Sequence, residues 1–181
     1  RFDSASSAPV DTTPAVPMPN PRDPHLWPQR ESLKLALQYP ELTGPYFDGL
    51  STDAFTHPAY RMIREAMGTL GGAGTAHSGV DWIAGVAGEM IDLMGRNLVS
   101  ELAVEEIPME EEHLRNYADS VLSRLQEAEV GNQIAQLKSQ LQRMRPSDNE
   151  QAYNSLFADL VALEQARREL NERAFRGLPA E

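Results

Sequence analysis

The spacing of apolar and polar residues predicts helices along most of the chain, preceded by a polar leader. Residues 1–24 are mainly Pro, Ser, Thr, Ala and Asp, with almost no aliphatic side chains. Such a composition buries too little apolar surface to offset the entropy of ordering the chain. We therefore expect a flexible, proline-rich linker there. From Trp27 onward, apolar residues recur three and four positions apart, as on the buried face of a helix.

Residues 25–130 are predicted to form a helical bundle. One helix begins near residue 58, where Thr56 or His57 can cap it and Pro58 suits its first turn. Another apolar series follows Asp81, but three glycines within it argue against one unbroken helix. Because no segment alternates strictly between apolar and polar residues, the fold class is all-α.

The glycine-rich segment between these helices, residues 71–79 (GGAGTAHSG), invites comparison with a phosphate-binding loop. A phosphate-binding loop ends in Lys-Ser or Lys-Thr and follows an apolar strand. Both features are missing from this sequence. We interpret the segment as a mobile connection between two helices.

The rest of the chain, residues 131–181, is predicted to be a C-terminal helical hairpin, joined to the bundle by a long connecting helix. If residues 109–145 form one helix, it is about 55 Å long, whereas a compact bundle of the preceding residues is only about 36 Å across. The helix must therefore break or project, and Gly131 is the favoured break. Ser147 and Glu150 have the spacing of a capping box that opens the last helix.

The last helix carries two apolar stripes. Leu160, Leu163 and Leu170 are predicted to hold the hairpin together, whereas another stripe lies roughly 100–140° around the helix. Packing on the bundle, on a neighbouring copy or on a partner protein would each cover this second stripe. We favour partner docking, because aromatic residues and arginines are common anchors at interfaces. The candidate docking residues are Phe157, Val161, Arg168, Phe175 and Arg176.

The charge distribution separates the hairpin from the rest of the chain. The whole chain has a net charge of −11, but residues 131–178 carry seven basic and six acidic side chains. An acidic protein is poorly suited to gripping nucleic acid along its phosphate backbone, which requires a basic face. We therefore expect no strong direct binding of nucleic acid. A helical module that binds single-stranded nucleic acid through the arginines of the hairpin remains an alternative.

No catalytic site is predicted. The chain has no cysteine, and its four histidines are scattered without a second ligand at helical spacing. Glu110, Glu111 and Glu112 before His113 point in different directions around a helix, so we expect no metal there. His57 is interpreted as a capping or packing residue. No apolar stretch reaches the length of a membrane span, and we expect a soluble, cytoplasmic protein with no membrane contact.

The order of these features resembles the C-terminal helicase-binding domain of a bacterial DnaG-type replicative primase. The resemblance covers essentially residues 25–178. It depends on a proline-rich linker followed by three stretches, which read PQRESLKLALQYP at 28–40, FTHPAY at 55–60 and LVALEQARREL at 160–170. These are helix ends and apolar positions, so their order carries the resemblance. The loop at 71–79 departs from it and leaves the helix count of the bundle open.

The resemblance implies that the hairpin docks on the N-terminal domains of the hexameric replicative helicase at the replication fork in the nucleoid. It also implies that the linker leads to zinc-binding and RNA-polymerase domains absent from this chain. Zinc, a divalent cation such as magnesium, and primer synthesis would belong to those domains, so this fragment is not expected to be an enzyme or to hold a cofactor. Contact with single-stranded-DNA-binding protein is implied without assigned residues. The N-terminal helical collar of a replicative helicase is the other alternative.

Overall fold

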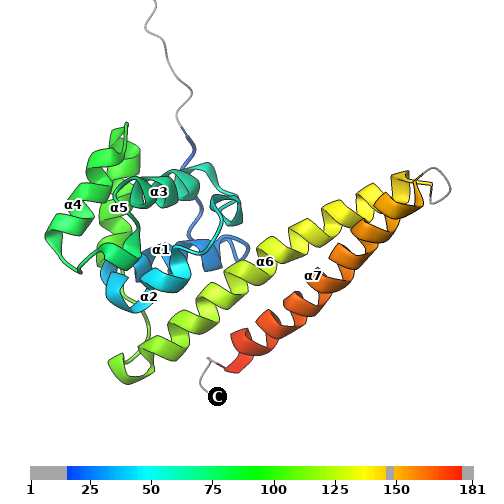
Figure 1. Cartoon of the computed structure of the whole chain (residues 1–181). Coiled ribbons are helices and arrows are strands. Elements are labelled where there is room, and N and C mark those ends of the chain that lie inside the picture. Colours follow the sequence, from blue (N-terminus) through cyan, green and yellow to red (C-terminus); the bar gives the residue numbers. More distant parts are fainter. Residues whose placement is uncertain (1–15, 146–148, 177–181) are drawn as a thin grey trace, which may run out of the picture.

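The computed structural model describes residues 16–145 and 149–176. The described residues form seven α-helices and three short 3-10 helices and contain no strand, which confirms the all-α prediction. In chain order the elements are α1 (Trp27–Gln38), α2 (Pro40–Phe47), η1 (Thr52–Ala54), α3 (Pro58–Thr69), η2 (Ala73–Thr75), α4 (Val80–Glu89), α5 (Leu93–Val104), η3 (Glu111–His113), α6 (Leu114–Arg143) and α7 (Glu150–Arg176). Helices α1 to α5 gather into a bundle, and α6 and α7 project from it side by side (Figure 1).

Helix α1 lies at the centre of the bundle and contacts α2, α3, α5 and α6. Leu33 and Leu37 on this helix are fully buried in the main core. The rings of Phe47 and Phe55 meet edge to face there, with centroids 6.0 Å apart. A helix surrounded on all sides must be covered on all sides, and α1 is accordingly buried over nine consecutive residues, 29–37.

Helix α3 begins as the sequence predicts. His57 is the residue before the helix, and its Nδ1 atom accepts a hydrogen bond of 3.2 Å from the backbone nitrogen of Ala59. Burial lowers the pKa of His57, which favours the neutral ring that can accept this bond. The imidazole therefore acts as a helix cap.

The loop at 71–79 connects α3 to α4, as predicted, but hydrogen bonds fasten it to the bundle, which the predicted mobility did not anticipate. Asp48 accepts hydrogen bonds from the backbone nitrogens of Ala73, at 2.9 Å, and Gly74, at 2.7 Å. The backbone of Gly74 crosses Gly44 so closely that a Cβ on Gly44 would lie 2.3 Å from the Gly74 Cα atom. The small residues permit a close backbone crossing.

Helix α6 runs without interruption from Leu114 to Arg143, so of the two predicted outcomes the helix projects, and the favoured break at Gly131 does not occur. Its 30 residues correspond to about 45 Å, and the helix projects beyond the bundle. Gly131 lies between Val130 and Ile134, which are both buried against α7. This packing offsets the helix-interior penalty of about 1 kcal/mol for glycine.

The structure describes the start of helix α7 and the last part of the predicted linker. Helix α7 begins at Glu150, where the side chain of Asn149 accepts a 3.0 Å hydrogen bond from the backbone nitrogen of Ala152. The predicted cap, Ser147, lies outside the described residues. Of the predicted linker, residues 16–24 are described, and Pro19 is buried. Helix α6 contributes side chains to both the bundle core and the hairpin. The predicted boundary between bundle and hairpin at residue 131 therefore falls within one continuous helix.

Candidate protein-docking surface

The hairpin is held together by a small apolar seam between α6 and α7. Val130, Ile134 and Leu170 are buried in a cluster of their own, and Leu160 and Leu163 pack against it. The predicted hairpin-packing residues thus all lie on the seam. This cluster is separate from the main core. The apolar side chains in the outer part of the hairpin are therefore covered mainly by the hairpin's own two helices and not by the bundle.

Among the described side chains, three ion pairs join α6 to α7 along the hairpin. The nitrogen–oxygen distances are 2.7 Å for Arg167–Glu127, 2.7 Å for Lys138–Glu164 and 2.6 Å for Arg173–Asp119. The hydrogen bond from Lys138 lowers the pKa of Glu164, and the bond to Glu127 raises the pKa of Arg167. Because these side chains are partly exposed, water and salt screen each pair and its contribution to stability is small. The pairs fix the register of the two helices more than they stabilise the protein.

The base of the hairpin is anchored where α7 returns to the bundle. The hydroxyl of Ser120, on α6, donates a 2.6 Å hydrogen bond to the backbone carbonyl of Ala174, on α7. Both residues are buried. Helix α7 therefore returns to the first turns of α6, where α6 also packs in the bundle.

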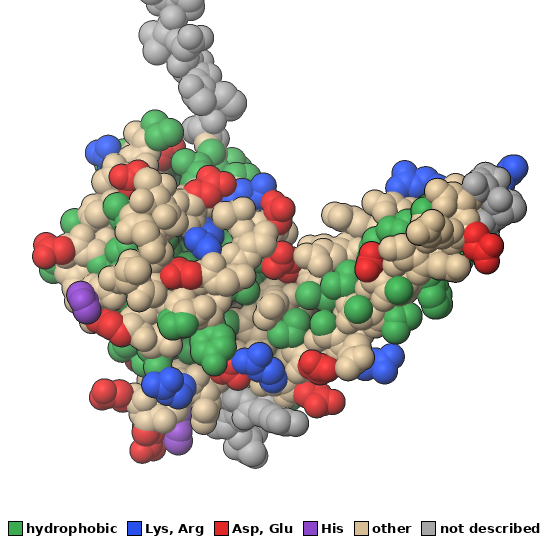
Figure 2. All heavy atoms as spheres, viewed as in Figure 1, with side chains coloured by type: hydrophobic (Ala, Val, Ile, Leu, Met, Phe, Trp, Pro, Cys, Tyr) green, Lys and Arg blue, Asp and Glu red, His purple; other side chains and the backbone are tan. Residues whose placement is uncertain are grey.

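The second stripe of α7 is exposed in this chain. Phe157, Val161 and Phe175 expose 53%, 54% and 68% of their surface, and Arg168 is also exposed. At 3.6 residues per turn, these four positions fall within about 40° of one another and extend over about 27 Å. Figure 2 shows hydrophobic side chains along the α7 side of the hairpin, interspersed with charged ones. Arg176 ends the same helix, and its side chain is not among those that the structure describes.

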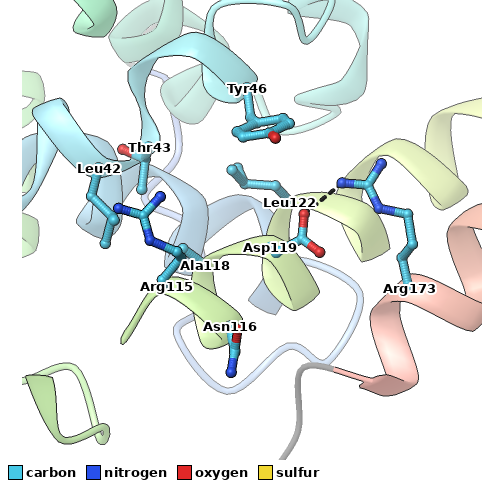
Figure 3. Close-up of a pocket in the computed structure, with 9 residues that line it drawn as sticks. All are labelled: Leu42, Thr43, Tyr46, Arg115, Asn116, Ala118, Asp119, Leu122 and Arg173. Carbon is cyan, nitrogen blue, oxygen red and sulfur yellow. Dashed lines mark hydrogen bonds and ion pairs between the residues drawn. The ribbon is translucent and has the colours of Figure 1, made fainter. Parts of the chain in front are cut away.

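A pocket of about 250 Å³ lies where the bundle meets the hairpin. Figure 3 shows side chains from α2, α6 and α7 around it. Leu42, Tyr46 and Leu122 supply apolar surface, Arg115 brings positive charge, and Arg173 is paired with Asp119 at 2.6 Å. The sequence did not indicate this pocket, because its walls come from three segments distant in the chain and show no common spacing.

Catalytic groups do not gather in the part of the chain that the structure describes. No three His, Asp or Glu side chains there lie close enough together to hold a metal ion. His77 and His113 are exposed, and each lies beside one glutamate. Among the described helices, none combines the length and apolar content that crossing a membrane requires.

Comparison with known proteins identifies the family. A family model described as DNA primase DnaG DnaB-binding matches residues 29–156. The DNA primase of Mycobacterium leprae is 48% identical over 173 residues, which are 96% of this chain and 27% of that protein. The DNA primase of Mycolicibacterium smegmatis is 51% identical over 162 residues, which are 89% of this chain and 26% of that protein. The chain thus spans about a quarter of the length of these relatives.

A solved structure has the same fold. The helicase binding domain of primase from Mycobacterium tuberculosis superimposes with a TM-score of 0.73 at 48% sequence identity. The match covers 84% of this chain and 94% of that chain. The sequence resemblance to a primase domain is confirmed, and the alternative of a helicase collar is wrong. The chain belongs to the DnaB-binding family of the bacterial DNA primase DnaG.

Proposed function

We propose that this chain is the helicase-binding domain of a bacterial DNA primase and recruits that primase to the hexameric replicative helicase. The observation that carries the proposal is the exposed stripe of Phe157, Val161, Arg168 and Phe175 on a hairpin that projects from the bundle. The family and the neighbouring structure support a helicase as the partner.

The chemistry of the stripe suits a protein partner. Two phenylalanines and a valine that are more than half exposed offer apolar surface whose burial favours association. Arg168 lies between them along the helix and forms no ion pair with another described residue. Its planar guanidinium can bind a carboxylate on the partner with two parallel hydrogen bonds. The apolar residues would supply affinity and the arginine would supply orientation.

Recruitment requires no chemistry of this domain. Docking through the hairpin would raise the effective concentration of the polymerase domains near unwound template. Primer synthesis, with its zinc and divalent cation, is proposed to belong to parts of the parent primase outside this chain. The chain itself is proposed to be non-catalytic and to act in the cytoplasm, at the replication fork on the nucleoid.

Gel filtration with the cognate hexameric helicase tests the docking face. A Phe157→Ala/Val161→Ala/Phe175→Ala variant is expected to bind the helicase at least a hundredfold more weakly, because it removes most of the apolar surface of the stripe. The matched control, Val80→Ala/Ile91→Ala/Leu93→Ala, removes three exposed apolar side chains from the bundle and should co-elute like the wild type. Equal co-elution of both variants would overturn the proposed face.

Contact with single-stranded-DNA-binding protein is a second candidate function. The pocket beside α2 is the candidate site, because Arg115 and the apolar walls suit an acidic segment with an apolar side chain, whereas Arg173 is already paired with Asp119. An Arg115→Ala/Tyr46→Ala variant should then lose this contact and keep the helicase. Retained binding to single-stranded-DNA-binding protein would remove the pocket from consideration.

Direct binding of single-stranded nucleic acid through the hairpin arginines is the competing function. Fluorescence anisotropy with labelled single-stranded DNA at several salt concentrations separates the two. Protein docking predicts weak DNA binding, whereas tight binding with a steep salt dependence would favour the nucleic-acid module.

A further inference from the structure

The segment that leads into the bundle does not hang free of it where the structure describes it. Val16 and Met18 line a small pocket together with residues of α3 and α5. The space left in this pocket is about 10 Å³, which is no more than one water molecule occupies. Pro19, the next residue, is buried. We call Val16–Pro19 the strap and the surface beneath it the methionine groove.

Methionines dominate the groove. Met62 on α3, Met90 after α4 and Met94 on α5 line it, with Leu98 deeper in the bundle. Figure 2 shows hydrophobic side chains around the point at which the described chain begins. Methionine side chains are unbranched and flexible, so they adapt to a segment of irregular shape. The groove suits a chain rich in proline, which presents few backbone donors.

Side-chain packing alone holds the strap. Within the described part of the chain, residues 16–19 make no hydrogen bond to α3 or α5. The hydrogen bonds of the following residues are local turns, such as the 3.1 Å bond from the Asp23 nitrogen to the Asn20 carbonyl. Met18 and Met94 remain partly exposed at the edge of the contact. A contact of this kind closes without ordering a ladder of hydrogen bonds and opens without breaking one.

We propose that the strap is a two-state device that opens and closes on the methionine groove and so sets the length of the tether to the preceding chain. When the strap is closed, the first described residues lie against α3 and α5, away from the tip of the hairpin (Figure 1). When open, residues 16–19 join the tether and extend its reach by about 13 Å. The part of this proposal that concerns polymerase domains rests on the proposed function, whereas the seating of the strap does not.

The length of a tether determines how strongly it concentrates what it carries. Effective concentration falls roughly as the −3/2 power of tether length once the tether can span the sites. A closed strap therefore favours delivery close to the bundle, and an open strap allows the attached domains to reach further. The groove would act on recruitment without touching the helicase-docking stripe.

Distance measurements between two spin labels test the device. The chain has no natural cysteine, so Pro17→Cys and Val80→Cys place both labels cleanly, one on the strap and one at the exposed start of α4. The doubly labelled chain with no further substitution is expected to give a narrow short-distance population for the two labels. Met94→Glu, which puts a charge at the edge of the groove, should reduce that population at least threefold, whereas the matched control Met94→Leu should preserve it.

A second variant keeps the test independent of the fold of the bundle. Met18→Glu changes only the strap and should also reduce the short-distance population at least threefold. Circular dichroism melts of all variants verify that the bundle stays folded. A wild-type chain with only a broad, long distribution would overturn the proposal, as would variants that leave the short population unchanged. Helicase co-elution of Met94→Glu, expected to equal that of the wild type, separates failure of this device from failure of the docking function.

Discussion

The hydroxyl of Tyr117, on the projecting helix α6, donates a 2.8 Å hydrogen bond to the carboxylate of Glu31, on the central helix α1. Both residues are buried, and the other carboxylate oxygen of Glu31 lies 2.9 Å from the Nζ atom of buried Lys34. Burial, reinforced by the nearby carboxylate, raises the pKa of the Tyr117 phenol and keeps it protonated as a donor. This bond attaches the root of the hairpin to the bundle.

Tyr117→Phe should therefore destabilise the whole domain. Removal of the hydroxyl leaves a buried carboxylate with one partner fewer, which costs about 1–3 kcal/mol of unfolding free energy. Urea unfolding followed by circular dichroism measures the loss. Tyr153→Phe is the matched control, because the Tyr153 hydroxyl makes no hydrogen bond within the described residues. Equal stability of the two variants would show that the Tyr117–Glu31 bond contributes nothing.

The acid stability of the bundle should depend on Glu105. This residue pairs with Arg30 and lies 3.3 Å from Lys34. Burial acts to raise the pKa of Glu105, but the hydrogen bond and charge of Arg30, together with Lys34, outweigh it, and the pKa lies below its usual value. A lowered pKa in the folded state contributes stability that is present above the unfolded value of about 4.3 and lost as the pH falls through the folded value.

Glu105→Gln should accordingly be less stable than the wild type at pH 7, and the difference should narrow below about pH 4.3. We expect the change in this difference to be under about 1 kcal/mol, because Glu105 is partly exposed to solvent. Urea unfolding at several pH values between 7 and 3 measures it. A difference that stays constant across the range would contradict the role of the Arg30–Glu105 pair.

Gly131→Ala should stabilise the chain. A Cβ at this position would lie 3.9 Å from Arg167, an ordinary contact distance, and alanine favours a helix interior over glycine by about 1 kcal/mol. Thermal unfolding should show a higher midpoint. Gly44→Ala provides the contrast, because its Cβ would collide with the backbone of Gly74 and the midpoint should fall. A loss of stability in Gly131→Ala would indicate that the helix is strained there.

The ion pair between Arg167 and Glu127 should contribute only a small coupling energy. A double-mutant cycle with alanine at both positions is expected to give about 0.3–1 kcal/mol, because the pair is partly exposed. The coupling should shrink in 1 M salt, where charges are screened over about 3 Å. The same cycle on Arg168 and Glu129, which form no ion pair with each other, should give a value near zero. A coupling above about 2 kcal/mol would show that the pair contributes more than helix register.

The sequence was informative where structure depends on neighbouring residues. Helical spacing identified the seam residues Leu160, Leu163 and Leu170 and the separate stripe that contains Phe157, because side chains three and four apart lie on one face whatever the helix packs against. The cap at His57 followed from the same local logic. The family followed from the order of these elements along the chain.

Contacts between distant segments determined the rest. Glycine at 131 predicts a break, but packing of Val130 and Ile134 on α7 carries helix α6 through it. The pocket beside Arg115 and the buried bond between Tyr117 and Glu31 join residues with no shared periodicity, so no pattern along the chain announces them. Exposure of the Phe157 stripe is likewise a tertiary result, because helical spacing groups apolar residues but does not determine which group finds a partner within its own chain.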